Sequence, residues 1–519
     1  MRYLVVVILS LATFAMSASA QLTKEQQIQK LNLVYHHIRN TYIDDISFEP
    51  LVDEAIKATL KELDPHSQYL TQEQMKVFRE RLRGEFAGIG IRYIMHNDTL
   101  VVRSVIQDSP ASRAGIMPND RVVSIDGQGV VGISADSAQL LMQGEVGSKI
   151  TIQTLRRGED RPRNINIKRD YVESSAIGTS YRVGEVGYIY ITAFSKPIAS
   201  EVYSAYKDLG DIKSLIIDLR DNGGGALTSA IDLSSMFLAK GDVIVSTEGK
   251  DGSDISYIKR GQIDIATPLV VIINENSASA SEIFAGAIQD HDRGVIIGHT
   301  SYGKGLIQKV YDLKDGSGLL LTTSRYKTPS GRIIQRPYSM GRGEEYKRDP
   351  MRYTHPDSIA QNPELMYTTL KLGRKVYGGG GITPDIYLDP HQVEVSPKLS
   401  KLYIEGLFEH LAIEIGDRVS HQSMLTQYPT IDDFVNSYEL DDELMELFYS
   451  YSNSTESDFT QSDIEFIRTM LNASIAEWLY GLWARYYIYN ESYDYTLQQA
   501  LKVANDPNTY GTILSCEDK

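Results

Sequence analysis

Residues 268–290, PLVVIINENSASASEIFAGAIQD, contain the pattern that decides the fold of the central part of the chain. The apolar run at 269–273 has the length and the β-branched content of a buried strand, and a serine-rich turn leads from it into a helix. The run SLIIDLR at 214–220 is a second segment of this kind. Short buried strands that alternate with turns and helices are typical of an α/β unit, which we expect over residues 183–390.

Three other regions differ from this unit in their periodicity. Residues 21–83 place apolar side chains at helical spacing, and so do residues 391–519. Residues 84–171 instead alternate strand-like runs with Gly, Asn-Asp and Ser-Pro breaks, which indicates a small β-rich module. We therefore predict a multidomain α+β protein with a helical N-terminal region, a β-rich module, an α/β core over 172–390 and a helical C-terminal extension.

The composition narrows the classes of protein to which this chain can belong. Its 519 residues are 42% hydrophobic and 23% charged, as in globular proteins with packed cores. The 52 basic residues are outnumbered by 68 acidic ones, so a broad basic surface for nucleic acid is not expected and neither is such a partner. The one cysteine, Cys516, excludes an intramolecular disulfide and a cysteine-rich metal site. We expect neither a metal nor another cofactor.

Residues 1–20, MRYLVVVILSLATFAMSASA, have the features of a cleaved export signal. Arg2 precedes an apolar run, and Ala18 and Ala20 form an A-x-A pattern before the expected cleavage point. The run is shorter than the roughly 20 residues that a membrane-spanning helix needs, which disfavours an uncleaved anchor. We expect an exported protein in the periplasm of a Gram-negative bacterium, with secretion as the alternative.

Two polar segments stand at the ends of predicted strands, where α/β folds place their sites. Residues 215–227, LIIDLRDNGGGAL, lack the G-x-x-x-x-G-K-[ST] spacing of a phosphate-binding loop, so nucleotide binding is disfavoured. Their glycine N–H groups can still hold an oxyanion. In residues 277–282, SASASE, a serine near a helix N-terminus suits a nucleophile, but it equally suits a simple helix cap.

A serine nucleophile needs a base, and the residues alone leave the identity of that base open. His291 and His299 follow the serines but form no recognisable triad pattern with them. Lys304, in SYGKGLIQ, can accept the proton if burial lowers its pKa from about 10.4 toward neutrality. A solvated surface lysine is the alternative interpretation.

The segment NSASASEIFAGAIQDHDRGVIIGHTSYGKGLIQ, residues 276–308, resembles a known family. It is similar to the active-site block of the C-terminal processing peptidases, also called tail-specific proteases, in its S-A-S-A-S-E, A-G-A-x-Q-D and G-K-G elements. Further motifs of that family appear in its order over about residues 24–390: LDPHSQYL (63–70), DLRDNGGGAL (218–227), GSGLLLTTSRYKTPSGRIIQ (316–335) and GGITPD (380–385).

The resemblance implies a crotonase-like protease core and a role for each matching residue. Ser279, the second serine of SASAS, would be the nucleophile, Lys304 the base and Gln308 the residue that positions the lysine. The backbone donors of the oxyanion hole would be Ala280 and either Gly223 or Gly224.

Residues 84–171 resemble a PDZ domain throughout their length. The elements that carry this likeness are GIGI (88–91), SPASRAGI (109–116) and NDRVVSIDG (119–127). In PDZ domains the first element is the loop whose N–H groups hold a peptide's C-terminal carboxylate, while the ligand adds a strand to the sheet edge. The matching residues are Gly88, Ile89, Gly90 and Ile91.

Together these expectations describe an exported serine endopeptidase that captures unstructured protein or peptide C-termini with its PDZ domain and cleaves by a Ser–Lys mechanism. Two alternatives stay open: a PDZ scaffold or chaperone would bind such tails without cutting them, and a Ser-His-Asp hydrolase would use His299 or His66. Residues 337–377 and the C-terminal extension lie outside the family's common core and have no predicted role. The sequence also leaves open a homo-oligomer or an activating partner.

Overall fold

The computed structural model describes residues 22–348, 362–389 and 394–515. The predicted export signal at 1–20 and Cys516 lie outside these residues. The described residues up to Thr59 form one unit, and those from Leu60 onward form a second. Within the described part of the chain, no helix combines the length and the apolarity that a membrane span requires.

The first unit consists of two helices, α1 (Lys24–Thr41) and most of α2 (Phe48–Lys61). Helix α1 begins in a capping box, in which Thr23 Oγ1 accepts from Gln26 N and Gln26 Oε1 accepts from Thr23 N. None of the side chains of α1 is buried, so the first residue of this helix is set by the capping box and not by packing in a core. The prediction of helices in this region is confirmed.

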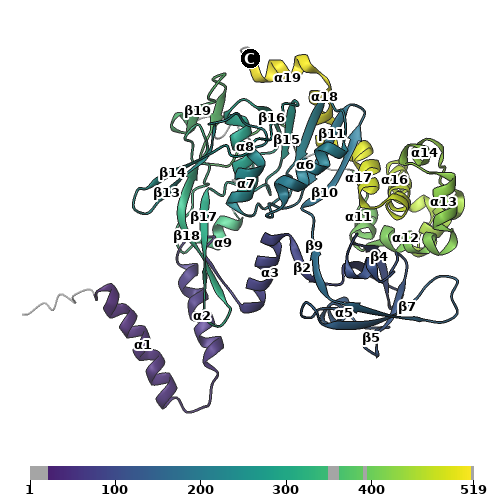
Figure 1. The fold of residues 1–519 in the computed structure, drawn as a ribbon, viewed down its shortest axis with the longest axis horizontal. Coiled ribbons are helices and arrows are strands. Elements are labelled where there is room, and N and C mark those ends of the chain that lie inside the picture. Colours follow the sequence, from purple (N-terminus) through teal and green to yellow (C-terminus); the bar gives the residue numbers. More distant parts are fainter. Residues whose placement is uncertain (1–21, 349–361, 390–393, 516–519) are drawn as a thin grey trace, which may run out of the picture. The chain divides into compact units, whose positions relative to one another are not determined.

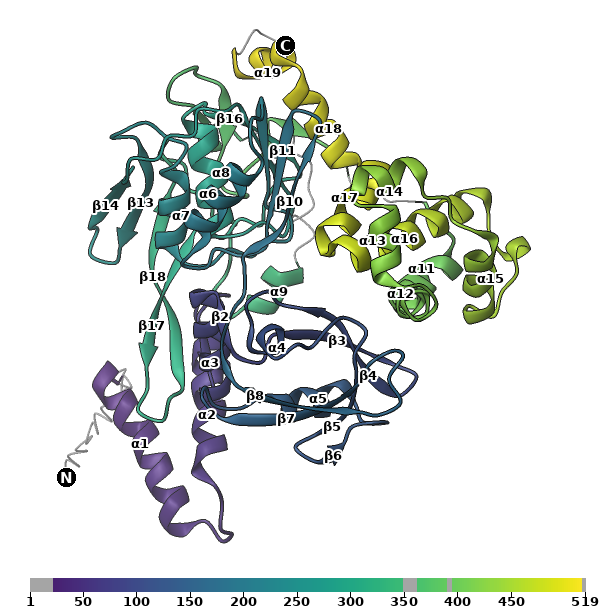
Figure 2. The ribbon, with the colours of Figure 1, turned by 45° about the vertical axis from the view of Figure 1, so that its right-hand side comes forward.

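The β-rich module begins where α3 (Gln72–Arg83) ends at Gly84, which has a left-handed φ of 73°. Five strands, which Figure 2 labels, form an antiparallel sheet in the order β3-β4-β5-β7-β8. Strand β6 pairs with β5, and β2 pairs separately with β9. The elements of the module are β2 (Glu85–Gly88), β3 (Ile91–His96), β4 (Thr99–Val105), α4 (Pro110–Arg113), β5 (Arg121–Ile125), β6 (Gln128–Gly129), α5 (Ala135–Met142), β7 (Lys149–Leu155), β8 (Arg163–Lys168) and β9 (Asp170–Glu173). Strand β3 lies at the edge of its sheet, where its free N–H and C=O groups can pair with an added strand.

The α/β core is built on a six-stranded sheet in the order β10-β11-β12-β15-β16-β21. Its strands are β10 (Ile177–Val183), β11 (Val186–Ile191), β12 (Ser214–Asp218), β15 (Leu269–Ile273), β16 (Gly294–Gly298) and β21 (Ile386–Tyr387). Apolar helices cover both faces: α6 (Ile198–Asp208), α7 (Leu227–Ser234) and α8 (Ala280–Asp290) pack on one (Figure 1), and α18 (Tyr495–Asn505) packs on the other. From β11 onward the strands pair in parallel, so the predicted α/β unit is confirmed.

A second, antiparallel sheet stands beside the first. Its strands are β1 (Gln68–Leu70), β13 (Val243–Gly249), β14 (Asp254–Ile258), β17 (Leu306–Asp312) and β18 (Gly318–Lys327). The order is β1-β18-β13-β14, and β17 forms a hairpin with β18. This hairpin places Gln308 opposite Thr322.

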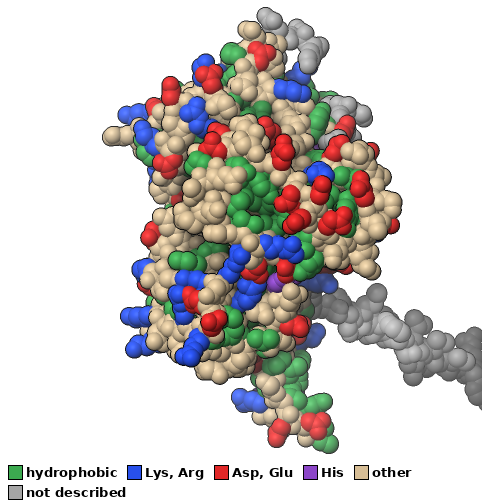
Figure 3. Space-filling view, turned by 90° about the vertical axis from the view of Figure 1, so that its right-hand side faces the viewer, with side chains coloured by type: hydrophobic (Ala, Val, Ile, Leu, Met, Phe, Trp, Pro, Cys, Tyr) green, Lys and Arg blue, Asp and Glu red, His purple; other side chains and the backbone are tan. Residues whose placement is uncertain are grey.

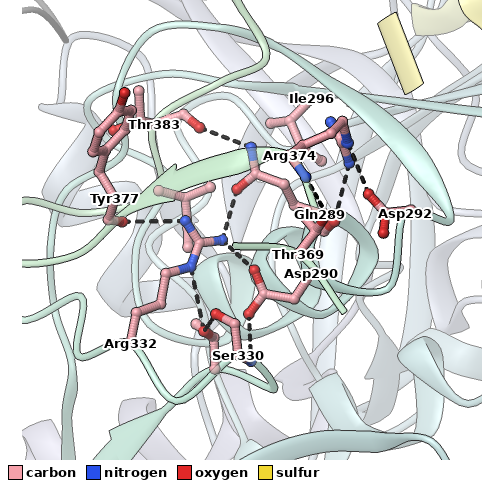
Figure 4. A network of polar contacts seen from close by, with 12 residues as sticks. Gln289, Asp290, Asp292, Ile296, Ser330, Arg332, Thr369, Arg374, Tyr377 and Thr383 are labelled. Atoms are coloured by element: carbon pink, nitrogen blue, oxygen red, sulfur yellow. Dashed lines mark hydrogen bonds and ion pairs between the residues drawn. The ribbon is translucent and has the colours of Figure 1, made fainter. Parts of the chain in front are cut away.

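A network of buried ion pairs anchors the C-terminal end of α8 (Figure 4). The side chains of Asp290 and Arg332 are fully buried and pair at 2.6 Å. Gln289 extends the network, because its Oε1 accepts from Arg332 at 2.7 Å and its Nε2 donates to Asp385 at 2.9 Å. Arg374 then pairs with Asp385 at 2.6 Å. Residues of the A-G-A-x-Q-D, S-G-R and T-P-D motifs thus form structural contacts that hold the C-terminal end of α8. The N-terminal end of this helix follows the SASAS serines.

The C-terminal extension contains a helical bundle with an apolar core of its own. Its helices are α11 (Pro397–Ile404), α12 (Leu407–Arg418), α13 (His421–Gln427), α14 (Ile431–Ser437), α15 (Asp442–Tyr451) and α16 (Gln461–Tyr480), followed by α17 (Leu482–Tyr493), α18 and α19 (Pro507–Ser515). The bundle contacts the PDZ-like module through ion pairs, including Arg103 with Glu477 at 2.6 Å. Figure 3 shows acidic and basic side chains interspersed over the face that it draws, so the acidic excess of the chain forms no single-sign surface there.

Candidate active site

Ser279 occupies the turn between β15 and α8 in a backbone conformation that few non-glycine residues adopt. Its φ is 57° and its ψ is −111°. Such conformations are strained, persist only where surrounding contacts hold them, and cluster at functional sites. A serine on a strained strand-to-helix turn is also the arrangement by which nucleophile elbows present a hydroxyl.

The two neighbouring serines use their hydroxyls for structure. Ser277 Oγ donates to Leu219 O at 2.8 Å, and Ser281 Oγ donates to Asn222 O at 2.8 Å. Both serines are buried, so these bonds fasten the SASAS turn to the chain that follows β12. In the described part of the chain, Ser279 Oγ donates to no backbone carbonyl, and its hydroxyl is the one of the three left for chemistry.

A buried carboxylate, Glu282, links the turn of Ser279 to the loop of Lys304. Its Oε2 accepts from Ser279 N at 2.7 Å and from Lys304 N at 2.9 Å, while its Oε1 accepts from Ser301 Oγ at 2.6 Å and from Gly303 N at 2.7 Å. Burial raises the pKa of Glu282, and these four hydrogen bonds oppose that rise. Sequence reasoning assigned no role to this residue, although its place three positions after Ser279 on a helix start was a visible signal.

Tyr326, on β18, makes a second link between the same two segments. Its hydroxyl donates to Lys304 O at 2.8 Å and lies 3.3 Å from Ser279 O. The side chain is almost fully buried, and burial raises its pKa well above the ordinary value, so the hydroxyl stays protonated as a donor. This contact, too, was not predicted from the sequence, because β18 is distant from both segments along the chain.

The Lys304 side chain is partly buried and lines the cavity described below. Burial lowers its pKa, and the nearby carboxylates of Glu282 and Asp64 oppose that shift. Partial burial favours the interpretation of Lys304 as a base over that of a solvated surface lysine. Within the described residues, no hydrogen bond joins Lys304 Nζ to Ser279 Oγ.

The predicted catalytic and oxyanion residues line one cavity of about 490 Å³. These residues are Ser279, Lys304, Gln308, Gly223, Gly224 and Ala280. Apolar side chains complete much of the wall, among them Phe78 and Leu82 of α3, Leu227, Ile283 and Leu306. The cavity therefore offers apolar surface for a substrate chain beside the polar groups.

The structure distinguishes the two candidate oxyanion glycines. Gly224 N donates to Asn222 Oδ1 at 2.9 Å, and its φ of 93° brings it so close that an added Cβ would lie 2.9 Å from Ser279 Cβ. Among the described residues, the N–H groups of Gly223 and Ala280 have no acceptor. Gly224 thus packs against the serine, and Gly223 and Ala280 keep N–H groups for a developing negative charge.

Comparisons with known proteins identify the family of this arrangement. The model of peptidase family S41 matches residues 185–339, and that of the PDZ domain matches residues 87–168. The carboxy-terminal-processing protease of Bartonella bacilliformis is 38% identical over 342 residues, which are 63% of this chain and 78% of that protein. The chain belongs to peptidase family S41. The resemblance to the C-terminal processing peptidases is thereby confirmed.

Other comparisons found further similar proteins. The carboxy-terminal processing protease CtpA of Bacillus subtilis is 34% identical over 317 residues, 60% of this chain and 68% of that protein. Among solved structures, the photosystem II D1 C-terminal processing protease is 26% identical over 70% of this chain and 88% of its own, with a TM-score of 0.35. Residues 398–481 of the extension match a family of unknown function, DUF8443.

The PDZ domain of this S41 peptidase has its predicted carboxylate loop between β2 and the edge strand β3. Gly90 has a φ of 85°, and an added Cβ would lie 2.2 Å from Ser109 Cβ, so this position requires glycine. Ile89 is buried and its carbonyl accepts from Ala111 N at 2.8 Å, which holds the loop on α4. Gly88 ends β2 and Ile91 begins β3. The loop therefore stands at the start of the strand edge that a peptide would extend.

The two histidines considered as alternative bases lie in different places in this S41 peptidase. His299 lies 3.4 Å from Glu275 and stacks on Tyr387, and it does not line the cavity in the described structure. His66 does line the cavity, but burial and the positive charge of Lys304 lower its pKa to about 4. A base with so low a pKa has little affinity for the serine proton.

Part of the segment at 337–377 reaches the same S41 site. Its helix α9 (Gly343–Arg348) contains Tyr346, whose hydroxyl lies 3.2 Å from Gly303 O, and Lys347, which lines the cavity. The strands β19 (Met366–Thr368) and β20 (Lys375–Tyr377) form a hairpin farther along the segment. The sequence had suggested no role for these residues, because their position depends on folding back onto the Lys304 loop.

Proposed function

We propose that this S41 peptidase is an exported serine endopeptidase whose PDZ domain captures unstructured protein C-termini and whose Ser279 and Lys304 hydrolyse peptide bonds. The observation that carries the proposal is the strained backbone of Ser279 in a cavity that also holds the partly buried Lys304. Burial supports the proposal because it favours the neutral amine, which is the form that can accept a proton.

In the acylation step, Lys304 Nζ takes the proton of Ser279 Oγ as that oxygen attacks the scissile carbonyl. The N–H groups of Gly223 and Ala280 stabilise the oxyanion of the tetrahedral intermediate. The ammonium of Lys304 then protonates the leaving amine, and the acyl group stays on Ser279. Hydrogen bonds between catalytic groups are often long without substrate and shorten in the complex. The lack of a hydrogen bond between Ser279 Oγ and Lys304 Nζ in the described structure is therefore compatible with this step.

In the deacylation step, Lys304 accepts a proton from water, whose oxygen attacks the acyl carbon. The second tetrahedral intermediate uses the same two N–H donors and collapses to a carboxylic acid, while the Lys304 ammonium returns its proton to the leaving Ser279 Oγ. Gln308 is proposed to orient Lys304 in both steps. Proton transfer thus needs no group beyond those that line the cavity.

The proposed substrates are proteins or peptides with a free C-terminus. The edge position of β3 supports capture by strand addition, and the Gly88–Ile91 loop would hold the terminal carboxylate. Residues 1–20 support export, with the periplasm as the proposed compartment and secretion as the alternative.

The decisive experiment is mass spectrometry of a disordered test protein incubated with wild type, Ser279→Ala and Ser281→Ala. We expect defined internal cuts with wild type and Ser281→Ala, and none with Ser279→Ala. A PDZ scaffold or chaperone would bind the test protein and leave it intact in all three incubations, which would overturn the proposal.

A further inference from the structure

Gln308, the proposed positioning residue of Lys304, is itself held by two hydrogen bonds that lead to Asp64. Gln308 Nε2 donates to Thr322 Oγ1 at 3.1 Å, and Thr322 Oγ1 donates to Asp64 Oδ1 at 2.9 Å. Gln308 and Thr322 lie opposite each other on β17 and β18, while Asp64 stands between α2 and β1. A residue distant in sequence is therefore joined to the β17–β18 hairpin beside the cavity.

Asp64 is a rigid and ionised acceptor. Its Oδ1 also accepts from His66 N at 2.9 Å and from Ser67 N at 3.0 Å, and its Oδ2 accepts from Ser67 Oγ at 2.5 Å. Burial opposes ionisation of Asp64, but the hydrogen bonds from Ser67, His66 and Thr322 outweigh it and lower the pKa of this carboxyl. Asp64 is therefore a carboxylate at any pH at which a lysine can be neutral.

The direction of each hydrogen bond in this chain follows from the carboxylate. An ionised carboxyl only accepts, so the single hydroxyl proton of Thr322 is directed to Asp64. The Thr322 oxygen then offers its lone pairs to Gln308, which must turn its Nε2 toward Thr322. The other end of the amide, Oε1, is left as an acceptor on a residue that lines the cavity with Lys304.

We propose that Asp64 is a positioning residue for the base, because through Thr322 it fixes the Gln308 amide with Oε1 available to the Lys304 amine. The inference rests on the proposed Ser–Lys function. An ammonium can only donate, so an amide turned the other way would present N–H groups to it and lose the contact. This assigns a role in the active site to the first polar residue of the LDPHSQYL motif.

Two substitutions separate the hydrogen-bond chain from the charge of Asp64. Thr322→Val removes the linking hydroxyl and keeps the carboxylate, whereas Asp64→Ala removes both the acceptor and a negative charge that raises the pKa of Lys304. Thr322→Ser keeps the hydroxyl and serves as the conservative variant. Thr323→Val is the matched control, because Thr323 is the adjacent threonine on β18 and, in the described structure, its hydroxyl bonds neither Gln308 nor Asp64.

The test is steady-state cleavage of a peptide that spans a mapped cut site, measured over a range of pH with each variant. We expect Thr322→Val to lower the plateau kcat on the order of tenfold with KM nearly unchanged, and Thr322→Ser and Thr323→Val to stay close to wild type. Asp64→Ala should show a comparable loss, and the rising limb of its pH profile should move to lower pH. The limb of Thr322→Val should stay in place.

Three results would overturn the inference. The first is an unchanged kcat in Thr322→Val, and the second is a loss of kcat in Thr322→Ser as large as that in Thr322→Val. The third is a loss of kcat in both Thr322→Val and Thr323→Val that is explained by reduced stability of the two variants. If Asp64→Ala fails to fold, the Thr322 variants still decide the question. Cleavage that survives Ser279→Ala in the same assay would instead overturn the proposed function, and the inference with it.

Discussion

Ser279 and Lys304 donate their backbone N–H groups to one and the same oxygen, Glu282 Oε2, at 2.7 and 2.9 Å. The two residues belong to separate segments, the turn before α8 and the loop before β17. Because one buried acceptor holds both backbones, the position of the proposed nucleophile relative to its base is fixed by a contact that neither side chain makes. Both side chains thus remain free for chemistry while their backbones are held.

The three serines of SASAS should respond differently to replacement. Ser279→Ala should abolish cleavage and leave the free energy of unfolding nearly unchanged. Ser277→Ala and Ser281→Ala should retain cleavage but lose about 0.5–1.5 kcal/mol of stability, because each removes one buried hydrogen bond while the carbonyl keeps a backbone donor. Peptide cleavage and urea unfolding measure the two effects. Inactivity of Ser281→Ala with an active Ser279→Ala would place the nucleophile elsewhere.

Lys304→Arg should be nearly as inactive as Lys304→Ala. A guanidinium keeps the positive charge but cannot accept a proton at any working pH. In wild type, kcat should rise with pH as Lys304 loses its proton, and burial places this rise below the ordinary range of a lysine. The pH profile of kcat measures this rise, and full activity of Lys304→Arg would contradict the proposed base.

His66 should make the stability of the protein depend on pH. Burial and the charge of Lys304 lower its pKa from 6.5 to about 4 in the folded state, so between these values the unfolded chain binds more protons. The stability is therefore complete above pH 6.5 and falls by about 3 kcal/mol as the pH drops to 4. Urea unfolding of wild type and His66→Gln at both pH values isolates this contribution. An equal loss in both proteins would contradict it.

The buried pair of Asp290 and Arg332 should be essential for stability. Asp290→Asn leaves the guanidinium buried without its charge partner, which should cost about 3–5 kcal/mol. The exposed pair of Arg342 and Glu345 provides the control, because Arg342→Ala should cost less than about 1 kcal/mol. Thermal and urea unfolding test both values, and a small effect of Asp290→Asn would show that the network is not needed to hold α8.

Substrate tails should be distinguished by their terminal charge. An unfolded substrate with a free C-terminal carboxylate after an apolar residue should be cut faster than its amidated twin, since loop N–H groups gain nothing from an amide. Replacement of Gly90 is a poor test, because an added Cβ would meet Ser109 at 2.2 Å and disturb the loop itself. Competition by a short peptide with a free C-terminus provides the control. Equal rates for both substrates at subsaturating concentration would remove the tail-recognition claim.

The sequence by itself determined the order of the domains and the identity of the motifs. The apolar runs that form β12 and β15 are short and bounded by turn residues, which predicts strands. The helical spacing of apolar residues in the flanking regions can likewise be recognised within each segment. The family resemblance then named Ser279, Lys304 and Gln308. These assignments depend on patterns within short segments, and such patterns can be recognised in the sequence itself.

Only the tertiary structure decided which groups surround those residues. The choice of Gly223 over Gly224 depends on a hydrogen bond from Gly224 N to Asn222, and the links through Tyr326 and Asp64 join segments far apart along the chain. Burial of Lys304, which decides whether it can be a base, is a property of everything packed around it. Such contacts arise when separate elements share one core, and no local pattern encodes them.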